Sequence, residues 1–387
     1  MRITREYGRR ISQGLTSADV ALEPRLPYPA GWSAVAFSEE LGTGAVLTRP
    51  LMGQDVVLYR PRTGEVRAIR PFCPHLGAHL GLGSVEGNDL VCPFHNFAFG
   101  PDGSCVRTAY DAPPPKVSLT QLPVREVNGA IFVWRHHDGR QPDWEIPAFH
   151  SLGHLRPHSA TWEMAGHAQE VIENSVDLGH FAVLHDLTNA ELGAPVAYDG
   201  VTFHVSMRAL GEFSVLGRHQ IEIEVDGYGL SCLHTDIRTP GMGLELCTKI
   251  MATMIAPNRM QFRQSTRFAV TEPSRLPPRL ARLVSRSLAR LLARPMFRFS
   301  CEFTAVDFPI WDTKEYRMPP GLAKGDGPIG PFRHWAQQFY PPPPGARTPP
   351  GSNGTRTPAE SNGTPTPPGS NGTRTPLVIP GEQPPPE

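Results

Sequence analysis

Two runs of side chains suited to metal binding lie about a hundred residues apart in this chain. The first joins Cys73 and His75 to Cys92 and His95. The second spans residues 173–185 and ends in two histidines. Thiolates with imidazoles hold zinc or iron–sulfur clusters, whereas two histidines with a carboxylate hold an iron(II) ion that keeps open positions. The two runs together predict redox chemistry at iron.

The first run is symmetric, because each half contributes one cysteine and one histidine. Cys73-x-His75 is followed after sixteen residues by Cys92-x-x-His95. Zinc sites usually pair like ligands, whereas this pattern suits two irons, with both thiolates on one and both imidazoles on the other. The spacing resembles the Rieske signature, which implies that these four residues bind one [2Fe-2S] cluster. A zinc-stabilised binding protein is the alternative, and it would be colourless.

The residues around this run indicate which type of Rieske protein the chain resembles. Respiratory Rieske proteins carry an extra cysteine in each loop, and Ala78 and Phe94 stand at those positions, as in the ferredoxin and oxygenase type. Relatives of that type usually have Gly and then Trp after the last histidine, where this chain has Asn96 and Phe97. Asn accepts a positive φ more readily than other non-glycine residues, so the loop is expected to turn. His79 is interpreted as a loop residue rather than a ligand.

The second run predicts a mononuclear metal site on a helix expected over residues 167–185. One face of that helix carries polar residues at spacings of three and four: Glu173, Asn174, Asp177 and His180. His180 and His185 are the candidate imidazole ligands. Residues five apart on a regular helix point about 140° apart. A break or a π-like widening is therefore predicted between the two histidines.

The order Asn174-x-x-Asp177-x-x-His180-x-x-x-x-His185 resembles the signature of Rieske non-haem iron oxygenases. The resemblance implies that Asn174 and Asp177 belong to the catalytic machinery and that the two histidines bind mononuclear Fe(II). In that family the aspartate bonds to the first histidine and to a cluster histidine of a neighbouring subunit, here His95 of the partner subunit. Electron flow between chains and a homotrimer are therefore implied.

The carboxylate ligand must come from far downstream, where Glu302, Asp307 and Asp312 are the nearby choices. Residues 307–311, with 325–328 and 332–340, resemble the C-terminal region of one subgroup of this family. That subgroup contains the 3-ketosteroid 9α-hydroxylase oxygenase components and the cholesterol 7-desaturases. The resemblance places the ligand at Asp307, and Glu302 is its main rival.

The chain divides into four parts by composition and pattern. Residues 1–30 form an N-terminal extension, and residues 31–147 hold short strand-like runs broken by glycine and proline, which predicts an all-β Rieske domain. Residues 148–340 are expected to form an α+β catalytic domain of the helix-grip type, with helices packed on an antiparallel sheet. Residues 341–387 are rich in Pro, Gly, Ser and Thr, repeat Ser-Asn-Gly-Thr every nine residues, and are expected to be disordered. The clearest strand signals are residues 56–59, 66–69, 131–134 and 220–225.

The charge pattern limits the partners. The formal net charge is zero, which argues against nucleic acid as the main partner. Arginines recur every three or four positions along a helix expected over residues 278–294, beginning just before it at Arg275. A solvated basic face, a docking face for an acidic electron donor and a shallow membrane contact are all compatible with this pattern. No secretory signal is visible, and six scattered cysteines do not form a disulfide framework, so a cytoplasmic setting is expected, with peripheral membrane contact as an option.

These expectations combine into one function. The resemblance implies the terminal oxygenase of a multicomponent system that uses O2 and electrons from NAD(P)H to hydroxylate or desaturate a sterol or steroid-like hydrophobic molecule. The sequence has no nucleotide-binding glycine loop, so a separate reductase, directly or through a ferredoxin, is the expected electron donor. One alternative is a tailoring oxygenase for another hydrophobic natural product or aromatic compound. Another is a plain Rieske electron carrier, which would leave the second run unexplained.

Overall fold

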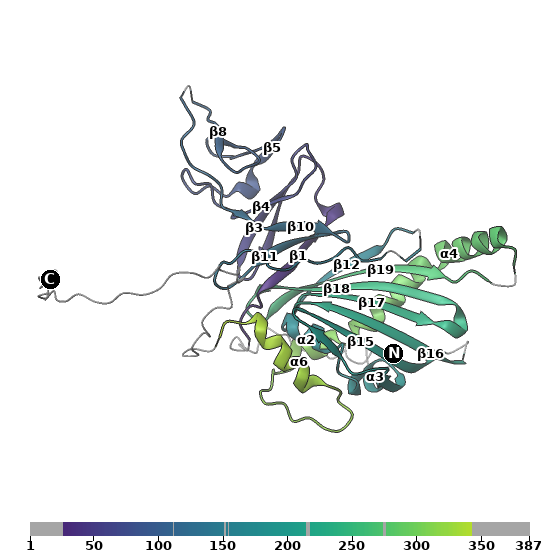
Figure 1. The fold of residues 1–387 in the computed structure, drawn as a ribbon. Helices are drawn as coiled ribbons and strands as arrows, with labels where there is room; N and C mark the ends of the chain where they lie inside the picture. The colour runs from purple at the N-terminus through teal and green to yellow at the C-terminus, as the bar shows by residue number, and fades with distance from the viewer. Residues whose placement is uncertain are drawn as a thin grey trace, which may run out of the picture. The chain divides into compact units, whose positions relative to one another are not determined.

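The computed structural model describes residues 26–342 except 111, 151, 154, 214–216 and 274–275. Contacts group residues 26–341 into one compact unit. The expectations for most of the N-terminal extension, for the repeat-containing tail and for Arg275 lie outside the described residues. The described chain consists mainly of antiparallel sheets with a few helices, which confirms the predicted α+β class (Figure 1).

Three small antiparallel sheets form within residues 31–135. Their strands, in order across each sheet, are β1 (Gly31–Phe37), β11 (Ala130–Arg135) and β10 (Val124–Val127); β2 (Val46–Leu51), β3 (Gln54–Tyr59), β4 (Arg67–Ile69) and β9 (Gln121–Leu122); and β5 (Ser84–Glu86), β6 (Asp89–Val91), β7 (Ala98–Phe99) and β8 (Cys105–Arg107). Asn128 at φ 59° and Gly129 at φ 81° make the tight turn that the sequence predicted between β10 and β11. The strand signals at 56–59, 66–69 and 131–134 fall in β3, β4 and β11 to within one residue.

One large antiparallel sheet forms within residues 158–270. Its strands run in the order β12 (His158–Ala165), β19 (Arg259–Val270), β18 (Leu244–Ala256), β17 (Cys232–Thr239), β16 (Gly217–Tyr228), β15 (Thr202–Phe213) and β13 (Leu187–Leu192), with β14 (Ala197–Asp199) paired to β15. Along β16, Ile221, Ile223 and Val225 are buried and the residues between them are half-buried. This confirms the predicted alternation of a strand with one core face. Phe332 and Trp335, from near the C-terminal end of the described residues, pack into the same core.

A buried arginine joins the large sheet to β1. The β1 register shifts between Ala34 and Ala36, and this bulge turns backbone carbonyls towards β19. The Arg263 guanidinium, 1% exposed, donates to the Ala34 carbonyl at 2.9 Å and to the Val35 carbonyl at 2.6 Å. Burial lowers the pKa of Arg263 to about 10. The group still remains charged at neutral pH. It supplies a donor to the Val35 carbonyl and a second donor to the Ala34 carbonyl, which also accepts from the Thr253 hydroxyl at 2.6 Å.

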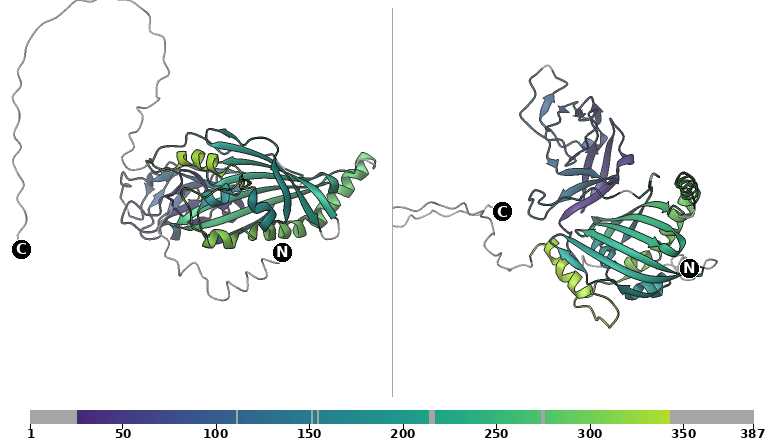
Figure 2. Two further views of the ribbon diagram at one scale, coloured as in Figure 1. Left: turned by 90° about the horizontal axis from the view of Figure 1, so that it is seen from below. Right: turned by 45° about the vertical axis from the view of Figure 1, so that its right-hand side comes forward.

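The helices lie against the large sheet. They are α2 (Ala168–Glu173), α3 (Gly179–Leu184), α4 (Pro278–Ala305), α5 (Phe308–Thr313) and α6 (Ile329–Ala336), with the short 3-10 turns η2 (Ser38–Glu40), η3 (Leu80–Leu82), η4 (Pro240–Met242) and η5 (Gln337–Phe339). Figures 1 and 2 show α4 along one face of the sheet, where it packs on β19. No helix of the described residues is long and apolar enough to span a bilayer.

Helix α4 is longer than predicted. The expected end at residue 294 was wrong, because the helix continues through Pro295 to Ala305. A proline inside a helix has no N–H for the carbonyl four residues back, here that of Leu291. Small buried residues on both sides of it, among them Ala289 and Ser300, keep the helix packed on the sheet across this missing bond.

Candidate metal centres

The two halves of the cysteine–histidine run form loops with the same backbone hydrogen bonds. The Cys73 N–H donates to the carbonyl five residues on at 2.9 Å, and the Cys73 carbonyl accepts from the Gly77 N–H at 2.9 Å. Cys92 repeats both bonds, at 2.9 Å and at 3.1 Å, with Asn96 as the second donor. Gly77 has φ 77° and Asn96 has φ 54°. Asn96 therefore adopts the positive φ that the sequence predicted, and the loops offer equivalent frames for their ligands.

The side chains of this run have the surroundings that a cluster needs. Cys73 is 3% exposed and Cys92 is 2% exposed, and the half-buried His75 and His95 rings lie 4.9 Å apart between centroids. Burial raises the pKa of the Cys73 thiol to about 11, and the adjacent Cys92 thiol contributes to the rise. Two neighbouring buried thiols bind as thiolates when a metal compensates their charge. The donor set and its burial thus fit a [2Fe-2S] cluster.

Residues next to the cluster loops take structural roles. Phe97 stacks on the His75 ring at 4.2 Å with an interplanar angle of 9°. His79 accepts a hydrogen bond from the Gly81 N–H at 3.1 Å and lies 3.4 Å from Asp55, so it is a loop residue and not part of the ligand set. The other cysteines are free, with three buried and one half-buried: Cys105, Cys232, Cys247 and Cys301.

The second centre brings together three side chains from two distant parts of the chain. The metal-binding atoms of His180, His185 and Asp307 all lie within 4.8 Å of one another. His185 Nε2 is 3.3 Å from Asp307 Oδ2, and the two imidazole rings are 5.1 Å apart between centroids. Asp307 follows α4 directly and caps α5, so the end of the long helix positions it. Phe303, one turn earlier, stacks on His185 at 4.2 Å.

Buried atoms without partners support a metal at this centre. The side chains of His185 and Asp307 are 3% and 8% exposed. His185 Nδ1 and Asp307 Oδ1 are buried without a hydrogen-bond partner in the described structure. Buried polar atoms are normally satisfied, and an ion is one explanation for an exception. Two imidazoles and one carboxylate on one side of a common point are the ligand set of non-haem iron(II) sites.

The helix carrying this centre breaks in a different place from the one predicted. The helix expected to run from residue 167 to His180 was wrong, because α2 ends at Glu173 and α3 begins at Gly179. The break predicted between the two histidines was also wrong. Residues 180–184 are helical, and His185 caps α3 at φ −106° and ψ 0°. The two rings approach each other because the chain leaves the helix at the second histidine.

A loop formed by residues 325–328 holds the interrupted segment. The Leu178 N–H donates to the Asp326 carbonyl at 3.1 Å. Gly327, at φ 88°, lies so close that a Cβ there would be 2.2 Å from the Val176 carbonyl oxygen. The glycine-rich segment 325–328 therefore contacts the backbone just before His180. The Leu178 N–H therefore bonds to this loop instead of to a carbonyl one turn back, so the backbone is not helical at this point.

Asp177 lies beside His180 as expected, but its backbone makes the closer contact. His180 Nδ1 is 2.6 Å from the Asp177 carbonyl oxygen and 3.8 Å from the carboxylate Oδ1. A carbonyl only accepts, so Nδ1 carries the proton and Nε2 keeps its lone pair for a metal. Burial raises the pKa of Asp177 and its contacts with His180 lower it, leaving it below the ordinary value. Asn174 is half-buried at the end of α2.

The other carboxylates considered as ligands lie elsewhere. Glu302 is exposed on α4, and Asp312 accepts from the Ala165 N–H at 2.7 Å. Glu173, which begins the second run, is buried and paired with Arg333 at 2.7 Å instead of facing the metal-binding atoms. Sequence reasoning missed Arg333, because only the fold brings α6 beside α2. Its signal in the sequence is its place within residues 332–340, which resemble the C-terminal region of the steroid subgroup.

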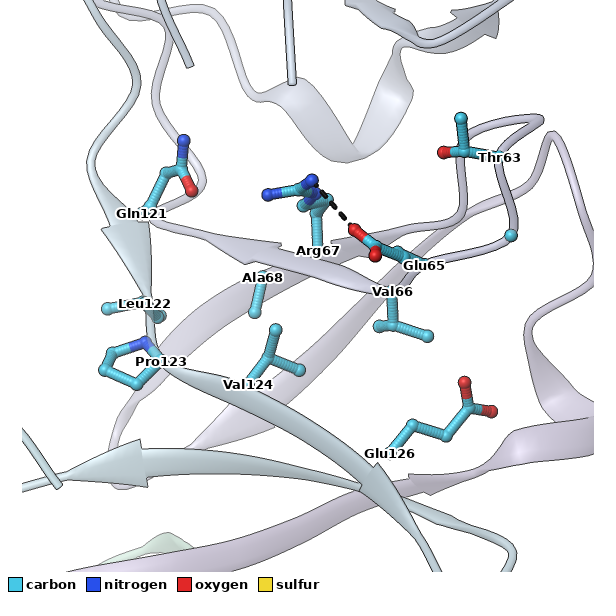
Figure 3. Close-up of a pocket in the computed structure, with 11 residues that line it drawn as sticks. Thr63, Glu65, Val66, Arg67, Ala68, Gln121, Leu122, Pro123, Val124 and Glu126 are labelled. Atoms are coloured by element: carbon cyan, nitrogen blue, oxygen red, sulfur yellow. Dashed lines mark hydrogen bonds and ion pairs between the residues drawn. The ribbon is translucent and has the colours of Figure 1, made fainter. Parts of the chain in front are cut away.

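The hollow shown in Figure 3 is separate from both centres. It has a volume of about 730 Å³ and lies over β4 and β9, where Arg67 pairs with Glu65 at 3.1 Å. None of the candidate ligands lines it. A second hollow of about 570 Å³ is lined only by uncharged residues: Leu192, Gly193, Ala194, Pro195, Val196, Tyr198, Pro328 and Pro331. The second has the apolar character expected of a surface that meets a hydrophobic molecule.

The fold and the two centres define a Rieske-type oxidoreductase with a catalytic domain of its own. Residues 31–140 match the Rieske [2Fe-2S] domain family, and residues 133–340 match the 3-ketosteroid 9alpha-hydroxylase C-terminal domain family. The chain therefore belongs to the Rieske oxygenases that carry the 3-ketosteroid 9α-hydroxylase C-terminal domain. The predicted family and enzyme class are confirmed.

Individual relatives agree with this assignment. The chain is 31% identical over 350 residues to the cholesterol 7-desaturase of Bombyx mori, covering 87% of this chain and 74% of the relative. It is 27% identical over 348 residues to the probable 3-ketosteroid-9-alpha-monooxygenase oxygenase component of Rhodococcus rhodochrous, covering 83% and 82%. Among solved structures, dicamba monooxygenase bound to dicamba has a TM-score of 0.56 at 16% identity, covering 80% of this chain and 97% of its own. Pseudomonas putida CBB5 NdmA has a TM-score of 0.58 at 19% identity, covering 79% and 88%.

Proposed function

We propose that this protein is the terminal oxygenase of a multicomponent system that hydroxylates or desaturates a sterol or steroid-like substrate. The observation that carries the proposal is the grouping of His180, His185 and Asp307 in a chain that also contains the two Rieske loops. A separate reductase, with or without a ferredoxin, would supply electrons from NAD(P)H. The names of the desaturase and monooxygenase relatives support the sterol or steroid class.

We assign each candidate residue a role within this proposal. Cys73, His75, Cys92 and His95 hold the [2Fe-2S] cluster, and His180, His185 and Asp307 hold one iron(II). When bound, these groups supply electrons and the activation of dioxygen. The Asp177 carbonyl keeps the proton on His180 Nδ1 and so fixes the ring with Nε2 free. Phe303 holds the His185 ring by stacking and shields it from water.

A homotrimer is part of the proposal. Asp177, with Asn174 beside it in the interrupted segment, would connect His180 to His95 of the partner subunit and so carry electrons between chains. The Asp177 side chain is 30% exposed and His95 is half-buried, so a neighbouring chain has access to both. The proposal treats residues 31–147 and 148–340 as the Rieske and catalytic domains. A cytoplasmic setting remains a prediction, which the free cysteines support.

A single-turnover assay tests the function. Purified protein is reduced without air, mixed with a panel of sterols and ketosteroids, and exposed to oxygen, and the products are read by mass spectrometry. We expect one hydroxylated or desaturated steroid. Oxidation of the cluster with every steroid unchanged would contradict the substrate class and favour another hydrophobic natural product.

Metal content separates the ligand assignment from the substrate assignment. Asp307→Ala is expected to lower the iron content from about three to about two per chain while keeping the visible spectrum of the cluster. Glu302→Ala is the matched control, because it removes a nearby exposed carboxylate. Retention of all iron by Asp307→Ala, or loss of iron in Glu302→Ala, would refute the assignment.

A further inference from the structure

Helix α4 buries its smallest side chains and exposes most of its leucines. Ala281, Ser285, Ala289 and Ala293 lie against the sheet, and the Ser285 hydroxyl donates to the Val270 carbonyl. Four leucines of the same stretch are exposed by 40–72%: Leu280, Leu283, Leu288 and Leu291. A helix on a soluble surface normally places its large apolar residues inwards. This leucine stripe is therefore an apolar surface that the described chain leaves uncovered.

Arginines line the leucine stripe along the helix. The arginine stripe consists of Arg279, Arg282, Arg286, Arg290 and Arg294, all of them exposed. Residues 278–301 contain no acidic residue. Arg282 lies 3.4 Å from Glu272, and no other arginine of the stripe has an ion pair with a described residue. The exposed face of α4 thus combines apolar side chains with a strong local positive charge, although the whole chain has a net charge of zero.

We propose that the exposed face of α4 binds the surface of an anionic lipid bilayer. The leucines would enter the apolar part of the bilayer, and the arginines beside them would contact its negatively charged headgroups. Long arginine side chains can reach the headgroups while their apolar stems stay beside the leucines. A second copy of this chain fits less well, because a two-fold contact would place like-charged arginine stripes together. An acidic electron donor would pair with the arginines but leave the leucines in water.

The location of α4 connects the proposed membrane contact with the candidate metal centre. Its last turns carry Phe303, which stacks on His185, and lead directly to Asp307. A helix lying on a bilayer at one end and bordering the metal centre at the other would bring the site close to molecules dissolved in the membrane. This connection rests on the proposed sterol or steroid substrate, whereas lipid binding itself does not. Figure 1 shows the outer end of α4 extending beyond the neighbouring strands.

Vesicle sedimentation of the full-length holoprotein tests the proposal. The vesicles contain phosphatidylcholine alone or an equal mixture with phosphatidylglycerol. We expect partition onto the anionic vesicles only, weakening as salt is raised. Arg286→Gln with Arg290→Gln should lower the partition coefficient about 30-fold, given the usual contribution of each arginine near an anionic surface. Leu283→Gln with Leu291→Gln should lower it at least about tenfold.

Matched controls carry the same substitutions elsewhere on the surface. They are Arg62→Gln with Arg208→Gln, and Met318→Gln with Leu322→Gln, all at exposed positions. The proposal is supported if wild type and both control pairs partition onto anionic vesicles and the two α4 pairs do not. No partition, equal partition onto neutral vesicles, or equal losses in the controls would overturn it. If the variant Leu283→Gln with Leu291→Gln differs from wild type in oligomeric state without lipid, the proposal is also overturned. The leucine stripe would then form a contact between copies of the chain.

Turnover with two forms of substrate delivery separates this proposal from the proposed function. When the sterol is supplied in cyclodextrin, the α4 pairs should match wild type. When it is supplied in anionic vesicles, they should be slower by the factor measured for binding. Lipid binding without turnover of any sterol would refute the proposed substrate class. It would still support the membrane-binding surface on α4.

Discussion

The guanidinium of Arg333 on α6 donates two parallel hydrogen bonds to the carboxylate of Glu173 on α2, at 2.8 Å from Nε and 2.7 Å from Nη2. Both side chains are at most 9% exposed. Arg333 also donates to the Arg317 carbonyl at 2.6 Å and lies 4.4 Å above the Tyr316 ring. This pair fixes the last turn of α2, directly before the segment that leads to His180 and His185, the proposed metal ligands.

Removal of one partner should therefore be costly. Arg333→Met leaves a buried carboxylate without a counter-charge, and we expect a loss of about 3–5 kcal/mol in the free energy of unfolding. The double variant with Glu173→Leu removes both charges and should recover much of that loss. Chemical denaturation of the three proteins measures the difference. A double variant as unstable as the single one would show that the pair is not the cause.

Gly327 should be essential to the shape of the segment before His180. In Gly327→Ala the new Cβ would lie 2.2 Å from the Val176 carbonyl oxygen and would also require φ 88°. Gly325→Ala is the control, because Gly325 has φ 112° but open space around its Cβ position. We expect Gly325→Ala to cost about 1–2 kcal/mol from backbone strain alone, and Gly327→Ala to cost more and to lose iron. Equal melting temperatures and iron contents in the two variants would contradict this.

His167 should make the protein less stable in mild acid. Burial lowers its pKa to about 4, and its ring contacts the Pro27 carbonyl and the Gln169 N–H at 3.1 Å each. The unfolded chain takes up a proton on this histidine near pH 6.5, whereas the folded chain stays neutral, so stability falls as pH drops from 7 to 5, by about 2 kcal/mol from this group. His167→Asn keeps a helix-capping acceptor and should lack this contribution. Unfolding curves at both pH values test it, with His334→Asn at an exposed position as the control.

Arg263 should matter more than its strand neighbour Arg259. Arg263→Met removes the guanidinium donor from the Val35 carbonyl and leaves the Ala34 carbonyl with the Thr253 hydroxyl alone, and we expect a loss of about 1–3 kcal/mol. Arg259→Met removes an exposed arginine that pairs with Glu163 and should cost at most about 1 kcal/mol. Denaturant titration of the two variants compares them directly. A small effect of Arg263→Met would mean that water replaces the guanidinium at the bulge.

Local patterns made much of this molecule predictable. The turn at Asn128-Gly129, the alternation along β16 and the positive φ of Asn96 follow from short-range backbone sterics and from one buried face. The Rieske resemblance was also visible, because the spacing of the cysteines and histidines is short and their residue types are chemically restrictive. The family and the enzyme class could be inferred from these few positions.

Features that depend on distant contacts were harder to predict. The interruption between α2 and α3 arises from the loop around Gly327, about 150 residues further along the chain. The partner of Glu173 is equally remote, and so the residue looked like part of a metal-binding face. The sequence alone left Asp307 and Glu302 as rivals, because only the end of α4 decides which carboxylate turns inwards.

Pro295 divides α4 into two mechanical parts. The missing bond to the Leu291 carbonyl makes the helix more compliant at this point than in the turns on either side. A force on the outer turns would be absorbed as a small change of bend at the proline before it reached Asp307. Buried residues on both sides of the proline, among them Ala289 and Ser300, hold the helix on the sheet and so limit this bending. Helix α4 is thus one continuous helix with a point of lower stiffness between its outer turns and Asp307.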